Sequence, residues 1–485
     1  MSSIIEVAIA VPLHNTFDYL CDYQVNIGAR VSVPFGRKKV VGVVLAEKNK
    51  SDYDNLRSVE EVLDKDGILS KEILDFLFWS ANYYHHPIGE VLLSALPKNL
   101  RQGKPAVVKK LTAHERELTP CNFETTKEQK TAIDAVLKSQ NSFHSFLIHG
   151  VTGSGKTEVY LRVTESLLKK GRQVLVLVPE IGLTPQMISR FEERVETKVV
   201  SIHSQLNETQ KTDAYLMAKN AEAGVILGTR SAIFTPIPKL GLVIVDEEHD
   251  DSFKQQSGFR YSARDLCFMR AKFANIPLLL GTATPSLETL KNVLDGKLTR
   301  LVLSSRPGAA ILPEINLIDM RAQSAEALSQ PLVARMRHYL DDNKQVMLFI
   351  NRRGYAPVFF CTECDWRAEC DSCDAALIYH RHINRLKCHH CGSEKLPEPS
   401  CPACHQSTLK VLGYGTERLE ENLESYFPNT PVIRIDRDTT RRKKAFAGHL
   451  EQIHSGKPCI LVGTQMLAKG HDFSELAFVG VLDVD

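Results

Sequence analysis

The chain has 485 residues, a length at which about three domains are expected, and its hydrophobic content of 43% is ordinary for a globular protein. No apolar run approaches the ~18 residues that a membrane span needs, and Met1–Leu13 lacks the basic start of a signal peptide, so we expect a cytoplasmic protein with no membrane partner. The formal net charge of +2 neither indicates nor excludes DNA binding, because a basic groove can be offset by acidic surface elsewhere.

Residues 1–100 are expected to form a small, mainly β domain. Short β-type runs at 4–11, 29–33 and 40–45 are separated by glycine and proline, and a helical pattern rich in aromatic residues follows at 70–86. Residues 101–122 are polar and contain two prolines, so we interpret them as a linker.

From residue 123 onward, apolar runs alternate with helical patterns, which is typical of an α/β fold with buried parallel strands. The first set predicts the strands of a lobe at 123–304, and these runs lie at 146–148, 174–178, 199–202, 225–227, 242–245 and 277–280. The second set predicts a lobe at 305–485, with runs at 346–350, 432–435, 460–462 and 478–482.

The strand predicted at 146–148 runs into G-V-T-G-S-G-K-T at Gly150–Thr157, and a predicted helix follows. This is a complete Walker A loop in the setting that it requires. Its glycines let backbone N–H groups wrap phosphates, and the helix N-terminus adds a positive dipole. We expect Lys156 to reach the β and γ oxygens of ATP and Thr157 to ligate Mg²⁺. The residues expected to bind the nucleotide are Gly150, Gly153, Ser154, Gly155, Lys156 and Thr157.

A second nucleotide motif follows where the apolar run at 242–245 ends in D-E-E-H at Asp246–His249. A strand that delivers acids to its carboxyl end is typical of a Walker B element, in which Asp246 would hold the metal and Glu247 would polarise the attacking water. A lone charge run is otherwise a solvated surface. Beside the Walker A loop, we expect Lys156, Asp246 and Glu247 to be the catalytic residues.

Eight of the twelve cysteines lie in four C-x-x-C pairs between residues 361 and 404. Each pair supplies two thiolates and tetrahedral zinc takes four, so the eight ligands fill two closed structural sites. Disulfides are the alternative, but regular C-x-x-C pairs in an intracellular protein indicate metal. The spacing permits nested or cross-braced pairing, and we expect nesting. The outer site would then hold Cys361, Cys364, Cys401 and Cys404, and the inner site Cys370, Cys373, Cys388 and Cys391.

Several further segments resemble one helicase family. D-E-E-H, together with G-T-A-T-P at 281–285, is similar to motifs II and III of superfamily 2 helicases. The four C-x-x-C pairs, as an insertion, and four other segments resemble the PriA family of bacterial replication-restart helicases over nearly the whole chain. Those segments are Val178–Gln186, Gly228–Phe234, Asn351–Tyr355 and Gly463–Phe473.

The resemblance implies an α/β fold with two RecA-like P-loop motor lobes. A two-zinc module with four cysteine ligands per zinc would be inserted at 360–408 of the second lobe, and a small, mainly β N-terminal domain would bind DNA. The module could be a folding staple or a platform for DNA and partners, and the sequence leaves both readings open. Its closed sites leave no coordination position for catalysis.

The activity that the resemblance implies is that of an ATP-dependent 3′–5′ DNA helicase or translocase. It would recognise stalled or restarted replication forks and initiate primosome assembly, with ATP, Mg²⁺ and two Zn²⁺ as cofactors. The implied partners are single-stranded and forked DNA, the 3′ end of the nascent leading strand, primosome proteins, the replicative helicase loader and single-strand-binding protein.

In the N-terminal domain, the resemblance implies a pocket for that 3′ end, formed by Phe17, Asp18, Tyr19, Gly36 and Arg57. Asp18 would accept a hydrogen bond from the terminal 3′-hydroxyl, while the rings of Phe17 and Tyr19 flank the last base. Arg57 would assist at the phosphate.

In the motor, the resemblance places an adenine-reading role on Gln129, for which an ordinary surface glutamine is the alternative. Arg230, Arg353 and Lys469 are candidates for phosphate or lobe-coupling contacts. Residues 251–261 are similar to an aromatic-rich loop that couples DNA binding to ATP hydrolysis. Its aromatic residues, Phe259 among them, would stack on bases with Arg260 near a phosphate, unless at least one of them belongs to the core.

The sequence departs from the family pattern in two places. Residues 101–122 are too short for the winged-helix module that the family usually carries. The chain stops at Asp485, before the position of motif VI, so we expect an incomplete second lobe and impaired hydrolysis in this truncated or shortened form. The alternative functions are a non-hydrolysing ATP- and fork-binding assembly protein and a restriction-type translocase without preference for a 3′-hydroxyl end.

Overall fold

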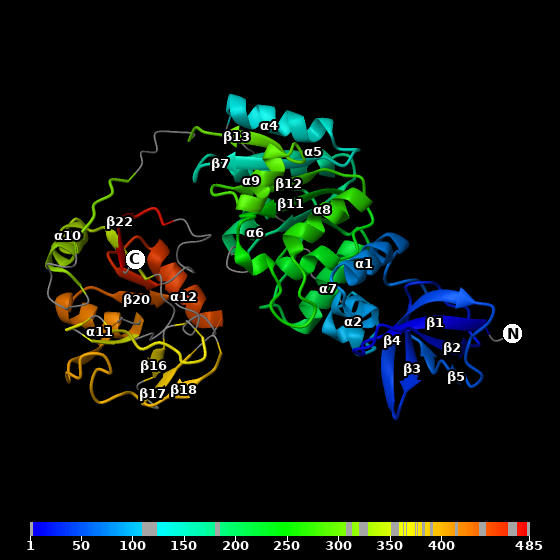
Figure 1. The fold of residues 1–485 in the computed structure, drawn as a ribbon. Helices are drawn as coiled ribbons and strands as arrows, with labels where there is room; N and C mark the ends of the chain where they lie inside the picture. Colours follow the sequence, from blue (N-terminus) through cyan, green and yellow to red (C-terminus); the bar gives the residue numbers. More distant parts are fainter. Residues whose placement is uncertain are drawn as a thin grey trace. The chain divides into compact units, whose positions relative to one another are not determined.

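The computed structural model describes residues 3–108, 124–179, 185–306, 313–319, 328–350, 358–361, 363–364, 366–373, 375, 377–380, 384–388, 391–412, 416–435, 443–463 and 473–482. The chain divides into two compact units, Met1–Leu312 and Pro313–Asp485 (Figure 1). Within the described ranges, no helix combines the length and the apolar character that crossing a bilayer requires.

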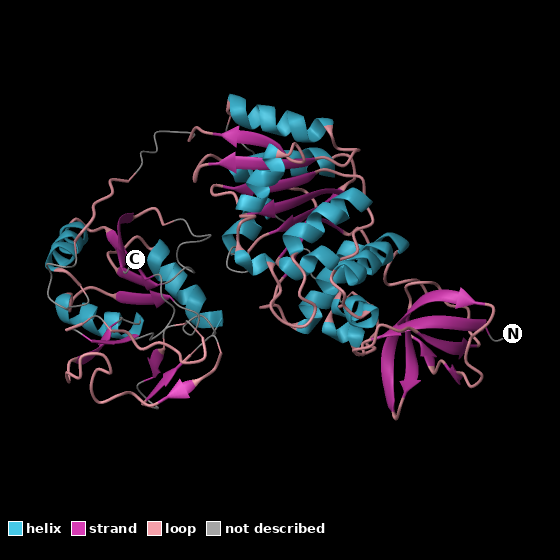
Figure 2. Ribbon diagram, in the orientation of Figure 1, coloured by secondary structure: helices cyan, strands magenta, loops and turns pink. Residues whose placement is uncertain are grey.

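The first unit begins with a six-stranded, mostly antiparallel sheet in the order β5-β2-β1-β4-β3-β6 (Figure 2). Its strands are β1 (Ser3–Ile9), β2 (Phe17–Cys21), β3 (Arg30–Phe35), β4 (Lys38–Lys48), β5 (Arg57–Ser58) and β6 (Glu61–Val62). The strands predicted at 4–11, 29–33 and 40–45 are confirmed as β1, β3 and β4. The sequence pattern does not predict β2, because Asp18 interrupts its short apolar run.

Three helices follow, α1 (Lys71–Tyr83), α2 (Ile88–Ser94) and α3 (Lys98–Arg101), and α1 confirms the helical pattern at 70–86. One hydrophobic core joins the sheet, these helices and the following lobe: it includes Val43 of β4, Phe76 of α1, and Phe234. The backbone of α2 lies so close to β1 that a Cβ on Gly89 would come within 1.7 Å of the Ile9 carbonyl oxygen. The N-terminal sheet and the first lobe are therefore parts of one packed unit.

The first lobe contains a seven-stranded parallel sheet in the order β13-β7-β12-β11-β8-β10-β9. Its strands are β7 (Ser145–Gly150), β8 (Gln173–Leu177), β9 (Lys198–Ile202), β10 (Ala223–Gly228), β11 (Leu240–Asp246), β12 (Leu278–Thr282) and β13 (Thr299–Leu303). All six predicted strands are confirmed. The seventh, β13, is an edge strand with mostly exposed residues, and its short apolar run Leu301–Leu303 was not predicted as a strand.

Helices cover this sheet on both faces (Figure 2). They are α4 (Lys127–Lys138), α5 (Lys156–Leu168), α6 (Pro185–Glu192), α7 (Glu208–Lys219), α8 (Ala263–Phe273) and α9 (Leu287–Leu294). The central strands are buried throughout, as in β8 and β10, because helices on both sides exclude water from a parallel sheet. This is the RecA-like arrangement that we expected for the lobe.

The second unit contains a four-stranded parallel sheet in the order β20-β21-β14-β22. Its elements are α10 (Gln330–Asp341), β14 (Gln345–Ile350), α11 (Thr416–Tyr426), β20 (Val432–Ile435), α12 (Lys443–His454), β21 (Ile460–Gly463) and β22 (Leu476–Leu482). These confirm the four strands predicted for the second lobe.

A separate antiparallel sheet interrupts this lobe between β14 and α11, in the order β18-β17-β16-β15-β19. Its strands are β15 (Val358–Cys361), β16 (Ile378–His380), β17 (Arg385–Lys387), β18 (Glu394–Lys395) and β19 (Leu409–Leu412). The cysteine-rich module therefore enters and leaves the lobe through the paired strands β15 and β19. The domain boundaries drawn from the sequence, at 100, 122 and 304, stay predictions.

Candidate functional site

Three neighbouring strands of the first lobe bring the nucleotide motifs together. β7, β12 and β11 are adjacent and parallel, so their carboxyl ends meet at one edge of the sheet, where such folds bind ligands. Gly150 ends β7, Thr282 ends β12 and Asp246 ends β11. This edge gathers the Walker A loop, G-T-A-T-P and D-E-E-H.

The Walker A loop has the geometry of a phosphate cradle. Gly153 and Gly155 have φ values of 79° and 81°, in the left-handed region that favours glycine, and Gly155 is the N-cap of α5. The ammonium of Lys156 donates to the Gly150 carbonyl oxygen over 3.0 Å. Ser154 is 1% exposed, and its hydroxyl has no hydrogen-bond partner among the residues that the structure describes. These groups fit a triphosphate, whose oxygens would give them partners.

The carboxylate of Asp246 faces this loop from the end of β11. The hydroxyl of the fully buried Tyr160 donates to its Oδ1 over 2.9 Å. Burial, with the nearby charge of Glu247, raises the pKa of Asp246 to about 6. Glu247 itself has a φ of 48°, which is unusual for a residue other than glycine and is typical of functional sites. A bound divalent cation would fit here, because it would favour the ionised form of Asp246.

The last two residues of D-E-E-H connect it to the segment after β12. His249 Nδ1 lies 2.8 Å from Thr282 Oγ1. The buried carboxylate of Glu248 accepts hydrogen bonds from the Ser286 backbone N–H and the Thr289 hydroxyl, both over 2.8 Å. Sequence reasoning gave Glu248 no role, although a carboxylate that follows a buried strand is a signal for one.

Gln129 is not a surface residue. It is 3% exposed and completes a capping box at the start of α4, where its Oε1 accepts from the Thr126 backbone N–H over 2.9 Å. Its Nε2 donates to the Ser154 carbonyl oxygen over 2.9 Å. The surface alternative is therefore wrong, and the adenine-reading role stays a prediction. In this structure, the amide oxygen caps the start of α4 and the amide nitrogen holds the Walker A loop against this helix.

The aromatic residues of the 251–261 loop belong to the core. Phe253, Phe259 and Tyr261 are 2%, 6% and 6% exposed. The ring of Phe259 contacts those of Tyr84, His86, Phe234 and Tyr261, so it presents no free face to a base. The expectation that Phe259 stacks on DNA is corrected accordingly.

The two arginines of this region remain accessible to different degrees. Arg260 is exposed, while Arg230 is half-buried and donates to the Ser252 carbonyl oxygen over 2.9 Å. Arg353 and Lys469 lie outside the described residues, as do 180–184, Asn351–Tyr355 and 464–472 of the signature segments.

The predicted 3′-end residues lie together on β2, β5 and the β3–β4 turn. Alternation along β2 separates them, because Tyr19 is 5% exposed in the core while Asp18 lies on the other face. Asp18 accepts from the Lys48 ammonium over 2.9 Å and from the Ser51 hydroxyl over 2.7 Å. The bond to Asp18 is the main reason why the pKa of Lys48 is raised.

The aromatic and cationic members of this group have partners of their own. Phe17 is half-buried and packs edge-on against Phe35, with ring centroids 5.2 Å apart. The Tyr19 hydroxyl donates to the Pro34 carbonyl oxygen over 3.1 Å. Arg57 donates to the Gly36 carbonyl oxygen over 2.9 Å. In this structure, Tyr19 is buried, whereas Arg57 and Gly36 are exposed.

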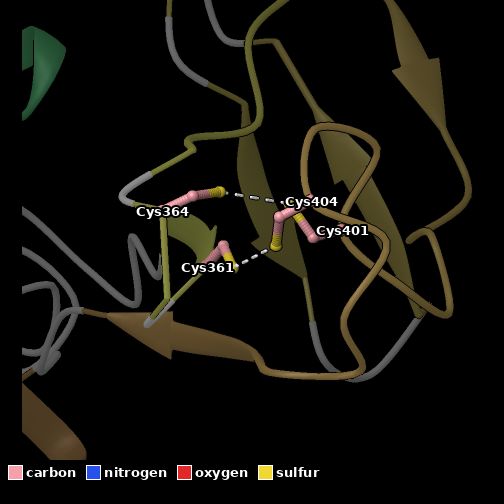
Figure 3. A group of neighbouring side chains, drawn as sticks. All are labelled: Cys361, Cys364, Cys401 and Cys404. Carbon is pink, nitrogen blue, oxygen red and sulfur yellow. Dashed lines mark hydrogen bonds between the residues drawn. The ribbon is translucent and has the colours of Figure 1, made fainter.

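The eight paired cysteines form two clusters in the second unit. In the outer cluster, the Cys361 and Cys404 sulfurs lie 3.5 Å apart and those of Cys364 and Cys401 lie 3.6 Å apart (Figure 3). The inner cluster joins Cys370, Cys373, Cys388 and Cys391, and within each cluster all four sulfurs lie within 4.8 Å of one another. Four sulfurs at about 2.3 Å from one zinc ion would be separated by about 3.8 Å, so both clusters fit zinc. The nested pairing is confirmed.

Comparisons with known proteins agree with this geometry. A family model described as 3'DNA-binding domain (3'BD) matches residues 6–97, one described as DEAD/DEAH box helicase matches 126–293, and one described as PriA DNA helicase Cys-rich region (CRR) domain matches 370–395. Replication restart protein PriA of Haemophilus influenzae is 40% identical over 99% of this chain and 77% of its own length. The chain belongs to the PriA family.

Other similarities extend along the chain. The PriA protein of Treponema pallidum is 35% identical over 100% of this chain and 74% of its own length. Among solved structures, RecG bound to a three-way DNA junction superposes with a TM-score of 0.43 at 16% identity, over 74% of this chain and 38% of that one.

Membership of the PriA family accounts for the three parts of the molecule. The chain is an ATP-dependent DNA helicase that uses ATP with Mg²⁺, and DNA is its partner. Its two four-cysteine clusters are zinc sites, and the match to the PriA Cys-rich region covers the inner cluster.

Proposed function

We propose that this chain moves 3′ to 5′ along single-stranded DNA, recognises stalled or restarted replication forks and initiates primosome assembly. One observation carries the proposal: the Walker A loop, D-E-E-H and G-T-A-T-P end three adjacent strands of a lobe that is packed against a DNA-binding sheet. The proposed partners are forked DNA with its 3′ leading-strand end, primosome proteins, the helicase loader and single-strand-binding protein. We place it in the cytoplasm, where its thiolates would stay reduced.

The proposed hydrolysis site uses the groups at the sheet edge. Bound ATP would supply the phosphoryl group, and the Mg²⁺ ion would neutralise part of its negative charge. Lys156 would exchange its bond to the Gly150 carbonyl for the β and γ oxygens, and Thr157 and Asp246 would hold the metal. Tyr160 would keep the Asp246 carboxylate oriented, and Glu247 would orient the attacking water. The expected adenine contact is Gln129, whose amide has one more N–H and one more oxygen lone pair than its bonds to the Thr126 backbone N–H and the Ser154 carbonyl use.

DNA contacts are proposed for four cationic side chains of the motor and for the N-terminal sheet. Arg230 and Arg260 in the first lobe, and Arg353 and Lys469 in the second, would meet phosphates or couple the lobes. At the 3′ end, the Asp18 carboxylate would accept from the terminal hydroxyl, with Lys48 and Ser51 holding it in place. Phe17 would meet the last base, and Arg57 beside Gly36 would meet its phosphate.

DNA-stimulated ATP hydrolysis by the 485-residue chain tests the proposed activity. We expect turnover that rises with fork DNA and is lost in Lys156→Ala, while DNA binding is retained. Binding of ATP and forks without turnover would instead favour a non-hydrolysing assembly protein.

Recognition of the 3′ end needs its own comparison, between forks whose leading strand ends in a 3′-hydroxyl and forks that end in a 3′-phosphate. We expect tighter binding to the 3′-hydroxyl fork, and we expect Asp18→Ala to remove this preference. Equal binding to both forks by the parent chain would favour a translocase without end recognition.

A further inference from the structure

The turn between α1 and α2 touches the loop that follows D-E-E-H. The hydroxyl oxygen of Tyr84 accepts a hydrogen bond from the backbone N–H of Ser262 over 3.1 Å, across 178 residues of sequence. The ring of His86 stacks on Phe259, with centroids 5.2 Å apart and an angle of 29° between the planes. Lys254 lies above the Tyr84 ring, 5.5 Å from its centroid. The N-terminal helices and the motor loop therefore meet through directional contacts as well as through apolar packing.

The loop itself is held closed. The Gln255 backbone N–H donates to the Tyr261 carbonyl oxygen over 2.9 Å, and Lys254 and Ser262 form an antiparallel bridge. Phe259 is buried among four rings. A closely packed loop moves as a body, so a displacement at the α1–α2 turn reaches Ser262 instead of being absorbed on the way.

Ser262 is where α8 begins. Its side chain caps the helix by accepting from the Asp265 backbone N–H over 3.3 Å. Two residues further, the Arg264 guanidinium donates to Glu248 over 3.3 Å and to the Ser286 hydroxyl over 2.9 Å. The first turn of α8 thus connects the bond from Tyr84 directly to D-E-E-H.

Glu248 is the meeting point of this network. Its carboxylate is buried, and besides the Arg264 bond it accepts from the Ser286 backbone N–H and the Thr289 hydroxyl, at the start of α9. Its own backbone N–H donates to the Gly281 carbonyl oxygen over 3.1 Å. A buried carboxylate depends on its cation, so the position of Arg264 decides how firmly Glu248 and the adjoining Glu247 are held.

We propose that Tyr84 is a positioning residue for ATP hydrolysis, which acts from the DNA-binding part of the chain through Ser262, Arg264 and Glu248. His86, stacked on Phe259, supports the same contact. The N-terminal sheet and helices α1–α3 would in this way influence the hydrolysis site without touching the nucleotide. The inference rests on the proposed function in one respect, that Glu247 orients the attacking water.

Tyr84→Phe tests the inference, because it keeps the ring and removes only the acceptor for the Ser262 N–H. The matched control is Tyr83→Phe, one residue away, on a side chain that is 59% exposed. We expect Tyr84→Phe to lower the DNA-stimulated kcat for ATP about 2- to 10-fold, which corresponds to one hydrogen bond, and to leave the KM for ATP unchanged. Tyr83→Phe should behave as the parent chain. Equal kcat values for the two variants would overturn the proposal.

Hydrogen exchange gives a readout that does not depend on turnover. In Tyr84→Phe, backbone amides at 282–290 should exchange faster than in the parent chain and in Tyr83→Phe, because Glu248 holds the start of α9 less firmly. Unchanged exchange in this segment would contradict the proposal.

Two further variants separate the inference from the proposed function. In a double-mutant cycle, the effects of Tyr84→Phe and Arg264→Lys on kcat should be less than additive, because both act on the Glu248 carboxylate. Full additivity would overturn the network. If Glu247→Gln hydrolyses ATP as the parent does, the proposed hydrolysis site fails, whatever Tyr84→Phe shows.

Discussion

Nδ1 of His249 lies 2.8 Å from Oγ1 of Thr282, and this contact joins the end of D-E-E-H to the last residue of β12. The Thr282 hydroxyl also accepts from the Thr284 backbone N–H over 3.0 Å, so the imidazole is linked to the backbone of that segment. A change at the phosphate site can therefore be transmitted to G-T-A-T-P through one side-chain pair.

Thr282→Val should weaken this coupling. The substitution keeps the branched shape inside a buried strand and removes the hydroxyl. We expect strand separation per ATP hydrolysed to fall about 5- to 100-fold, the worth of the two hydrogen bonds that the hydroxyl makes. Thr282→Ser, which keeps the hydroxyl, is the control and should retain most of the parent ratio. A Thr282→Val variant that unwinds as efficiently as Thr282→Ser would contradict this role.

Asp246 should make stability depend on pH in the absence of metal and nucleotide. Its folded pKa of about 6 lies above the ordinary value of 3.8, so the folded state binds more protons between these values and stability falls as the pH rises from about 4 to about 6. Asp246→Asn lacks this charge. It should exceed the parent in stability by up to about 3 kcal/mol at pH 7.5, and this advantage should shrink progressively toward pH 4. Thermal unfolding of both proteins between about pH 4 and pH 7.5 measures this difference in stability. A difference that does not change with pH would contradict the raised pKa of Asp246 as its cause.

The Arg30–Asp64 pair should stabilise the N-terminal sheet and its contact with helices α1–α3. Arg30 is fully buried, and its guanidinium donates to Asp64 over 2.7 Å and to the Leu100 carbonyl oxygen over 2.6 Å. Asp64→Asn leaves a buried cation without its partner and should cost about 3–5 kcal/mol.

Urea unfolding followed by Trp79 fluorescence, in a Trp366→Phe background that leaves one tryptophan, measures this cost. Glu60→Gln is the matched control, because the Lys39–Glu60 pair is exposed, and it should cost less than about 1 kcal/mol. Similar costs for the two variants would refute the role given to the buried pair.

Zinc content tests the nested clusters. The parent chain should bind two zinc ions. Cys364→Ser with Cys404→Ser removes two ligands from the same cluster, so this double variant should keep one zinc ion per chain. Cys364→Ser with Cys391→Ser disrupts both clusters and should keep none. Cross-braced pairing predicts the opposite result for the two double variants.

Much of the fold could be predicted because buried parallel strands leave continuous apolar runs. Val174–Leu177 is one example, with no exposed side chain to break the pattern. The two strands that the sequence analysis missed have short apolar runs beside polar residues, because Asp18 interrupts β2 while Thr299 and Arg300 begin β13. The order of the cysteine pairs along the chain permitted nested and cross-braced pairing alike, and it is the position of the sulfurs in space that confirms the expected nesting.

The site was predictable where a motif fixes the local backbone and unpredictable where distant segments meet. The sequence of Gly150–Thr157 alone determines the backbone conformation of the Walker A loop. By contrast, an aromatic residue in a polar loop has the same sequence pattern whether it faces DNA or the core, and the burial of Phe259 depends on helices about 170 residues earlier. The role of Glu248 likewise depends on Arg264 and Ser286, which no local pattern connects to it.

Directional strand separation is the decisive measurement of ATP-driven movement in the 3′ to 5′ direction. Two partial duplexes, one with a 3′ single-stranded tail and one with a 5′ tail, are offered to the parent chain and to Glu247→Gln with ATP and Mg²⁺. We expect the parent to separate the 3′-tailed duplex faster, and Glu247→Gln to bind both duplexes but separate neither. Equal rates on the two duplexes, or a Glu247→Gln variant as active as the parent, would contradict the proposed movement.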